Sequence, residues 1–189
     1  MIGTRMGWLA LGFTVLSLES LSSRVPDVPS PGRRCDFYAS PSAPAWSPTS
    51  MVASATVIVR ARADSVAPIA KVRSGFGPQS LVRFTVLEVI DSRRVTLPTV
   101  LSLRGELTSV PDFNRGTVPY TSSRPGGLRG ACFAFAYQKG GEFLLLLAGT
   151  SADSLTPYWD PLRPTNEQVR GTNDPWVTWV RANRRAGQR

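Results

Sequence analysis

Segments of strand length in which apolar and polar residues alternate constrain the fold of this chain more than any other feature. The segment ASATVIVRARADSV, residues 53–66, is rich in β-branched residues and has a period of two, which is typical of a half-buried strand. One of its expected faces carries Val57, Val59, Ala61 and Ala63, and the other carries Thr56, Ile58, Arg60 and Arg62. LVRFTVLEVIDS, residues 81–92, and TVLSLRGEL, residues 99–107, predict two further strands. Three such segments with short connections and no helical period between them predict an antiparallel meander.

The second half of the chain contains a long loop and one strongly apolar strand. From Thr108 to Gly130 the sequence has no period and is rich in Pro, Gly and Ser. This pattern predicts a loop of unusual length, and long loops are often functional. A strand over residues 131–137 and a turn at residues 139–141 are expected to follow. The unbroken leucines within Glu142–Ala148 predict a strand that is buried on both faces, and a further short strand is expected near residues 154–159.

Two helices are expected in the C-terminal segment, residues 161–189. Thr165, with a glutamine three residues later, forms a capping-box pattern, and Gly171 would end that first helix. Asp174 is a suitable N-cap for a second helix that has Pro175 at its first position. The arginines near the end of the second helix are Arg181, Arg184 and Arg185. We interpret them as capping residues in a solvated tail; the alternative is a binding patch.

The N-terminus has the composition of an export signal. Arg5 precedes an apolar run, residues 6–18, and small polar residues follow the run, as in secretory signal peptides. The run is shorter than the roughly 20 residues of a membrane span, and no later apolar run is longer. Residues 1–22 are therefore expected to be a leader and the protein to be secreted or periplasmic; the alternative is an uncleaved membrane anchor. The proline-rich residues 23–50 are expected to form an extended arm or linker.

The expected export indicates how the two cysteines are paired, and the net charge bears on possible ligands. Oxidising compartments favour disulfides, so Cys35 and Cys132 are expected to be bonded to each other. The net charge is +9, and only Lys71 and Lys139 are lysines among the 22 basic residues. An arginine excess of this kind fits the codon bias of a GC-rich genome, and a dedicated polyanion site is the alternative.

The composition excludes several kinds of catalytic site. The chain has no histidine, which removes Ser-His-Asp and Cys-His catalysis together with the commonest zinc ligand. No glycine motif that would hold a phosphate follows an expected strand, and the carboxylates have no recognisable paired spacing. We expect no enzymatic activity, no metal and no cofactor; a hydrolase that uses carboxylates is the least favoured alternative.

The order of these segments resembles the netrin-like domain, the fold of tissue inhibitors of metalloproteinases and their bacterial relatives. Cys35 on an arm, the three strands, and then ACFAFAYQKGGEFLLLL, residues 131–147, carry the resemblance. It implies a mainly β fold, a closed or partly open five-stranded antiparallel Greek-key barrel of the oligonucleotide/oligosaccharide-binding (OB) type over residues 51–160. One or two C-terminal α-helices would pack beside it. The inhibitors use a Cys-x-Cys pair to present a zinc-chelating terminus, and Cys35 has no such partner, so that mechanism is not implied.

These features together predict a binding module with two alternative surfaces. The first hypothesis is an interaction or inhibitor-like module that contacts an extracytoplasmic protein through the arm and the long loop. Its expected aromatic contacts are Phe37, Tyr38, Phe113 and Tyr120. The alternative is the binding of a polyanion, an anionic glycan or a nucleic acid, on the strand face. The arginines expected to carry it are Arg60, Arg62, Arg83 and Arg104.

Overall fold

The computed structural model describes residues 47–69, 78, 80–93, 95–129, 131–157 and 163–186 of the 189-residue chain. The expected leader, and the expected arm as far as residue 46, lie outside these residues. The last residues of that expected arm begin a short helix, α1 (Pro48–Ser54), which Ser47 caps by accepting the backbone N–H of Ser50 at 3.1 Å.

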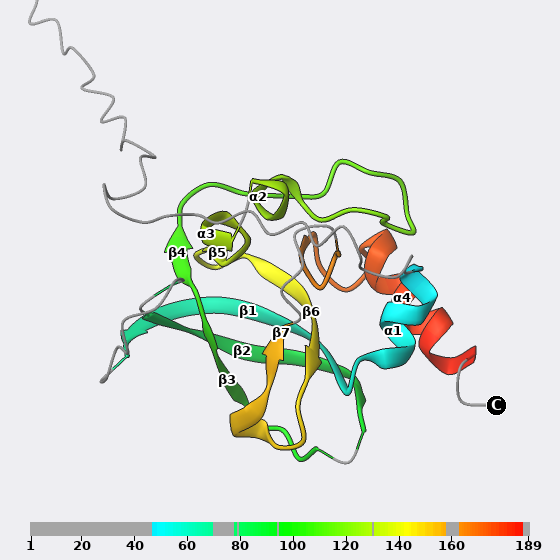
Figure 1. The fold of residues 1–189 in the computed structure, drawn as a ribbon, viewed down its shortest axis with the longest axis horizontal. Coiled ribbons are helices and arrows are strands. Elements are labelled where there is room, and N and C mark those ends of the chain that lie inside the picture. The colour runs from blue at the N-terminus through cyan, green and yellow to red at the C-terminus, as the bar shows by residue number, and fades with distance from the viewer. Residues whose placement is uncertain are drawn as a thin grey trace, which may run out of the picture. The chain divides into compact units, whose positions relative to one another are not determined.

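A curved antiparallel sheet forms the centre of the fold (Figure 1). Strands β1 (Val57–Pro68), β2 (Ser80–Ser92) and β3 (Val100–Arg104) pair in sequence order, which confirms the expected meander. The apolar strand β6 (Glu142–Ala148) pairs antiparallel with the other edge of β1. The long strand β1 therefore lies between the meander and β6.

Strand β6 uses its second edge for two different strands. Strand β8 (Asn166–Val169) pairs with residues 142–145, and β7 (Thr156–Pro157) pairs with residues 147–148. Strands β4 (Glu106–Thr108) and β5 (Ala136–Gln138) form a separate parallel pair. The order of the main sheet is β3-β2-β1-β6-β7, with β8 also on β6. Among the described residues this ladder does not return from β6 to β3, so its hydrogen bonds do not close a barrel.

Strands β1 and β6 bury side chains on both faces, as the leucine run predicts. One core lies on the face that Val59, Phe143 and Leu145 share, and it includes Phe84 of β2 and Tyr137 of β5. The second core lies on the opposite face. It contains Ile58, Leu144 and Leu146 from the sheet, Met51 and Val52 from α1, and Trp176, Val177 and Val180 from helix α4 (Pro175–Ala186). Successive side chains of a strand point to opposite faces, so two adjacent apolar strands support two cores.

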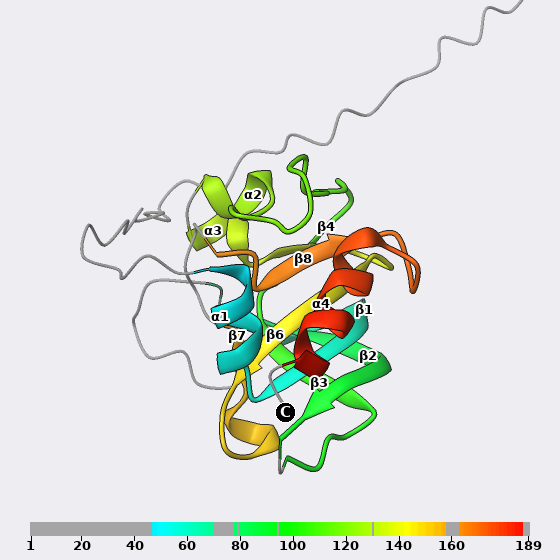
Figure 2. The same ribbon diagram turned by 90° about the vertical axis from the view of Figure 1, so that its right-hand side faces the viewer.

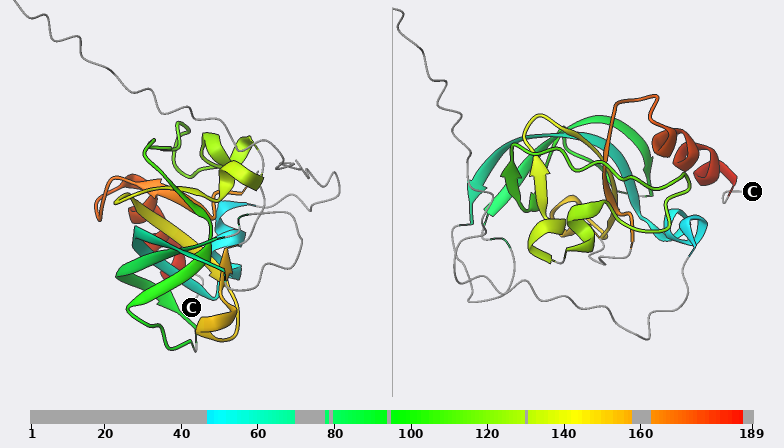
Figure 3. Two further views of the ribbon diagram at one scale, coloured as in Figure 1. Left: turned by 90° about the vertical axis from the view of Figure 1, so that its left-hand side faces the viewer. Right: turned by 90° about the horizontal axis from the view of Figure 1, so that it is seen from above.

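Bulges bend the pairing of β1 with β2. The register shifts between Ile58 and Val59, between Arg60 and Ala61, and between Ala63 and Ser65. A bulge adds a residue to one strand and increases its local bend and twist. Both strands are visibly curved along their length (Figure 3), and the curvature brings the far ends of the sheet around the first core.

The structure corrects two predictions of secondary structure. The helix expected from Thr165 to Gly171 is wrong, because residues 166–169 form strand β8. All four residues of β8 are buried, and their polar side chains make tertiary hydrogen bonds that a solvent-facing helix would not provide. The strand expected over residues 131–137 is shorter than predicted, since Ala131–Ala134 form a helical turn, α3, and only β5 is extended.

The second expected helix is confirmed at its N-terminus. Asp174 precedes α4, and its carboxylate accepts the backbone N–H of Trp176 at 2.9 Å and that of Arg170 at 2.9 Å. None of the helices in the described part of the chain is both long and apolar enough to cross a membrane.

Arg184 corrects the interpretation of the last helical turn as a solvated tail. Its side chain is 3% exposed and donates to the carbonyl oxygens of Val52, Ala53 and Ala55 at 2.6, 3.2 and 3.0 Å. Its Nε also donates to the carboxylate of Asp91. These carbonyls lie at the end of α1, where backbone acceptors have no partner within the helix. The guanidinium therefore joins α4 to α1, and the two helices lie next to each other (Figure 2).

We predict that Arg184→Ala lowers the free energy of unfolding by about 3 kcal/mol, because it removes the ion pair with the half-buried Asp91 and leaves the carbonyls at the end of α1 without this donor. Asn183→Ala is the matched control, since this neighbour is only partly buried and donates a single bond, to the carbonyl of Trp179. We expect the control to cost less than about 1 kcal/mol. Urea unfolding of both variants measures the difference, and equal midpoints would contradict the role of Arg184.

Candidate functional site

The long loop between β4 and α3 is held in one shape by a set of polar residues, buried except for the half-buried Asp112, which we call the loop network. Its members are Asp112, Asn114, Arg124, Asn166 and Glu167. Three of them come from the loop and two from β8, so the loop is fastened to the sheet through β8. A short helical turn, α2 (Pro125–Leu128), follows Arg124 directly.

Arg124 is the centre of the loop network, with a side chain that is 0% exposed. Its guanidinium donates to Asp112 at 2.5 Å, to the carbonyl of Asn166 at 2.9 Å and to the carbonyl of Ala134 at 2.7 Å. It also lies over the rings of Tyr137 and Phe143, 5.5 and 5.6 Å from their centroids. A buried cation is tolerated only when its donors and charge are satisfied in this way.

Asp112 connects the start of the loop to the turn that follows Arg124. Its carboxylate accepts the backbone N–H of Gly126 at 2.9 Å, and its own N–H donates to the side chain of Gln168 at 2.7 Å. A Cβ at Gly126 would collide with that carboxylate. Glycine at this position therefore allows the turn to approach Asp112 closely.

Glu167 is a fully buried carboxylate with two donors. It accepts the backbone N–H of Arg124 at 2.8 Å and the amide of Asn114 at 3.0 Å. Burial raises the pKa of Glu167 to about 7, against the lowering effect of these donors and of the Arg124 charge. The carboxylate and the guanidinium are both occupied by contacts within the fold. Their chemical role is therefore to fix the loop backbone.

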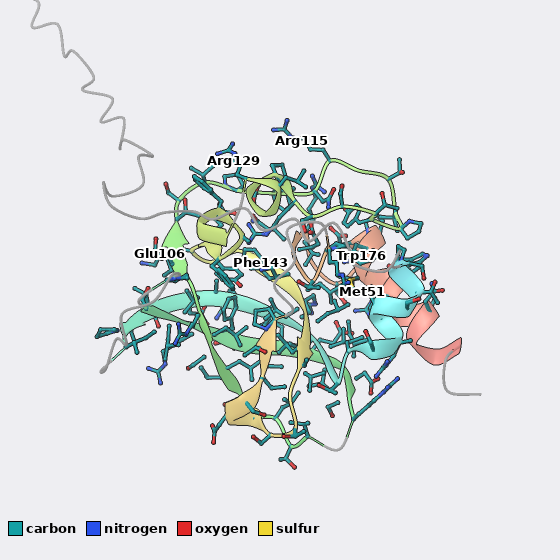
Figure 4. All side chains as sticks on the ribbon, viewed as in Figure 1. Met51, Glu106, Arg115, Arg129, Phe143 and Trp176 are labelled. Carbon is teal, nitrogen blue, oxygen red and sulfur yellow. The ribbon has the colours of Figure 1, made fainter. Side chains whose placement is uncertain are left out.

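The outer side of the loop carries exposed apolar groups and arginines, which we call the loop surface. It consists of Val110, Phe113, Arg115, Leu128, Arg129 and Arg170. Val110 and Leu128 are 48% and 43% exposed. The guanidinium of Arg170 lies 4.4 Å from the ring centroid of Phe113, and Arg115 and Arg129 project outward from the same side of the fold (Figure 4).

The structure separates the aromatic residues that the sequence singled out. Phe113 is half-buried at the loop surface and bridges to Gln168 of β8. Tyr120 is 6% exposed and lies 5.0 Å from Trp176, ring to ring, so it is a core residue and not a surface contact. Phe37 and Tyr38 lie outside the described residues.

The four arginines expected on the strand face differ in their partners. Arg60 is held between Glu88 and Glu142, at 3.2 and 2.5 Å, and Arg62 pairs with Asp64 at 2.6 Å. Glu88 has a second arginine partner, Arg181 of α4, at 2.6 Å. This pairing with Arg181, aided by Arg60, holds the pKa of Glu88 below its ordinary value despite its partial burial.

Arg83 and Arg104, in contrast, are exposed and form no ion pair with another described residue. They belong to adjacent strands, because Arg83 pairs with Ser102, two residues before Arg104. The two guanidinium groups therefore share the outer face of the sheet.

The expected disulfide stays a prediction. Cys35 lies outside the described residues, and Cys132 is described only in its backbone, within α3. Among the described residues no group of histidine, cysteine and carboxylate side chains could hold a metal ion.

Sequence reasoning missed most of the loop network. Arg124 lies in a Gly- and Pro-rich segment that has no period, and the capping pattern predicts a helix at Asn166 and Glu167, which lie in β8. The one available signal was the combination of a long loop with a polar segment that follows the apolar strand. Nothing in either segment showed that the two are in contact.

Comparison with known proteins gives no match to a protein-family model, to a curated protein or to a solved structure. The class of the protein therefore follows from its own structure. It is a mainly β protein with an antiparallel sheet, two apolar cores and a long loop held by a buried polar network.

The raised pKa of Glu167 predicts a pH dependence of stability. The carboxyl titrates near 4.5 in the unfolded chain and near 7 in the fold. Between these values the folded protein binds a proton that the unfolded chain releases. The contribution of Glu167 is therefore largest below pH 4.5 and is lost as the pH rises through 7.

We expect the wild type to lose about 2 to 3 kcal/mol relative to Glu167→Gln between about pH 5 and pH 8. Urea unfolding at a series of pH values measures this difference. Glutamine is the matched control because its amide does not titrate, and the chain has no histidine that would titrate in the same range. Parallel stability curves for the two proteins would contradict the assignment.

Proposed function

We propose that this protein is a non-catalytic binding module that contacts an extracytoplasmic protein through the loop surface. One observation carries the proposal: a loop of more than twenty residues is fixed from within by a buried charge network while its outer side keeps arginines and apolar groups exposed. Burial of Arg124 and Glu167 is costly unless they are well paired. A network of this kind holds the loop surface in one conformation, which suits a role in binding.

The composition of the loop surface supports a protein partner. Arginine and aromatic residues are enriched at protein interfaces, and exposed aliphatic groups beside them add apolar area. Arg115 and Arg129 form no ion pair with a described residue, while the nearby carboxylates of Asp112 and Glu167 are bound inside the loop network. The loop surface therefore presents positive charge, and an acidic patch on the partner would complement it.

The strand arrangement supports the proposal that the fold is OB-like and of netrin type. The proposal rests on three pairings: the meander, the pairing of β6 with β1, and β8 on the far edge of β6. A single parallel bridge between Phe113 and Gln168 joins the chain beyond β4 to β8. We propose that this bridge is the point at which the barrel is nearly closed.

The proposed location is outside the cytoplasm, and the proposed Cys35–Cys132 bond would place the arm, with Phe37 and Tyr38, near α3 and the loop surface. We predict that the mature protein lacks the leader, residues 1–22, and contains one intramolecular disulfide. Mass spectrometry of the intact mature chain, with and without reduction, measures both. A mass that retains the leader favours the membrane-anchored alternative, and two alkylated thiols in the unreduced protein would contradict the bond.

Charge reversal tests the loop surface. We predict that Arg115→Glu/Arg129→Glu abolishes capture of the partner from an extracytoplasmic extract of the source organism, because it replaces the exposed positive charges with repulsive ones. Arg83→Glu/Arg104→Glu is the matched control, since it changes the net charge equally on the sheet face. Retained capture by the loop variant, or equal loss by both variants, would contradict the proposal.

Polyanion binding on the sheet face remains a second candidate because Arg83 and Arg104 are exposed and unpaired in the described structure. The same two variants separate it from the first. If the sheet face binds polyanions, heparin retention falls steeply with salt and is lost in Arg83→Glu/Arg104→Glu. The pairing of Arg60 and Arg62 with carboxylates leaves only half of the expected arginines for this role.

A further inference from the structure

Strand β3 is an edge strand, and the hydrogen bonds of its neighbours show which of its backbone groups face outward. Val86 donates to the carbonyl of Thr99 at 2.9 Å, and Gly105 donates to the carbonyl of Ser80 at 3.0 Å. In an antiparallel pair, hydrogen-bonded and non-hydrogen-bonded positions alternate. Leu101 and Leu103 therefore bond to β2.

It follows that the N–H and C=O groups of Val100, Ser102 and Arg104 point away from β2. No described residue pairs with these outward groups. The side chains of the same three residues are exposed, whereas Leu101 and Leu103 are each 3% exposed. The edge is thus open along one side of a strand whose other residues are anchored in the first core.

The edge is open over β3 but occupied immediately beyond it. At Glu106 the chain turns to β5 and donates to the carbonyl of Phe135 at 2.9 Å, and Thr108 accepts the N–H of Lys139 at 2.9 Å. The bend lies at Gly105, where a Cβ would come within 2.6 Å of the Tyr137 ring. Strand β5 pairs with β4, immediately after β3. An added strand could therefore pair with β3 only as far as Gly105, where the pairing with β5 begins.

Unpaired positive charge lies beside this open edge. Arg104 belongs to β3, and Arg83 lies on β2 directly opposite Ser102. The small serine leaves space above it, so the longer side chain of Arg83 can extend across β3 toward an added strand. Neither guanidinium forms an ion pair with a described residue, unlike Arg60 and Arg62 on the same sheet.

We propose that the open edge of β3 binds an extended, acidic segment of a partner protein as an additional strand. Backbone hydrogen bonds to Val100, Ser102 and Arg104 would supply the pairing, and carboxylates near Arg83 and Arg104 would supply the preference for an acidic sequence. This surface is separate from the loop surface, and its occupation goes beyond the function proposed above.

A second copy of this chain is a poor occupant of the same edge. Antiparallel pairing of two β3 strands about Ser102 would bring Arg83 and Arg104 of both copies onto one face. In this register Arg104 of one copy lies opposite Val100 of the other, so the four arginines share one face without being direct cross-strand neighbours, and charged residues on an edge protect natural proteins from self-association. The same arginines that disfavour self-pairing favour an acidic strand.

The experiment uses the full mature chain and the peptide acetyl-Val-Glu-Val-Glu-Val-Glu-Val-amide as the probe. By NMR hydrogen exchange, we expect the amides of Val100, Ser102 and Arg104 to exchange fast in the free protein and to slow on addition of the peptide. The amides of Leu101 and Leu103 should be protected throughout. If the three outward amides are already protected in the free protein, another part of the chain covers the edge and the proposal fails.

Two methylated forms of the peptide test strand pairing separately from charge. One carries N-methyl groups on its glutamate amides and the other on its valine amides, so each blocks one edge of the peptide. We expect one form to lose binding and the other to keep it. The form that loses binding gives the strand direction: the glutamate form for antiparallel pairing and the valine form for parallel pairing. Equal behaviour of the two forms would overturn the proposal.

Variants of β3 and β2 complete the test. Ser102→Pro removes the central outward N–H at a position where an edge strand tolerates proline, and we expect it to weaken peptide binding at least about tenfold. Ser102→Thr is the matched control and should bind as the wild type does. Arg83→Glu and Arg104→Glu should each weaken binding by about fivefold at low ionic strength, whereas Arg115→Glu/Arg129→Glu should not change it. Wild-type affinity in Ser102→Pro, with Leu101 and Leu103 still protected, would contradict the proposal.

Discussion

The pairing of β1 with β6 is the constraint on which the rest of the structure depends. Strand β6 is apolar on both faces, and β1 adds Ile58 to one face and Val57, Val59 and Ala61 to the other, so the sheet cannot be covered on one side only. On one face the curvature of the meander and the ring of Tyr137 complete the first core. On the other, α1 and α4 supply the second core through residues such as Met51 and Trp176. The helices are thus a requirement of the strand sequence and not an addition to it.

The loop network provides hydrogen-bond partners for the polar residues of β8. Strand β8 covers the remaining edge of β6, and its asparagine, glutamate and glutamine lie where apolar residues would be expected in a buried strand. Because these side chains are buried, they need partners, and the loop supplies Arg124, Asn114 and the backbone around Asp112. The sheet therefore determines the conformation of a segment that has no regular structure of its own. A binding surface on such a segment is rigid even though it is a loop, which reduces the entropy lost on binding.

The sequence pattern correctly predicted the elements whose signal lies within their own residues. The alternation in β1, β2 and β3, the leucines of β6, and the Asp174–Pro175 start of α4 were all found where expected. The pattern failed where long-range contacts decide the structure: Asn166–Val169 became a strand because it completes the edge of β6. Of the proposed site residues, Tyr120 is a core residue because Trp176 lies beside it, and Arg60 is neutralised by carboxylates from two other strands. Those neighbours are far away in sequence, so no local pattern could identify them.

The hydrogen bonds from Arg184 to the carbonyls at the end of α1 have a consequence for the order of folding. The bond from Arg184 to Val52 spans 132 residues, so the second core cannot be completed until the last helical turn has been synthesised. In a nascent chain, the face of β6 that carries Leu144 and Leu146 stays uncovered from the synthesis of β6 until that of α4. Arg184 can bond to α1 only after β1 to β8 have been synthesised, so this contact is among the last long-range contacts that these elements can form.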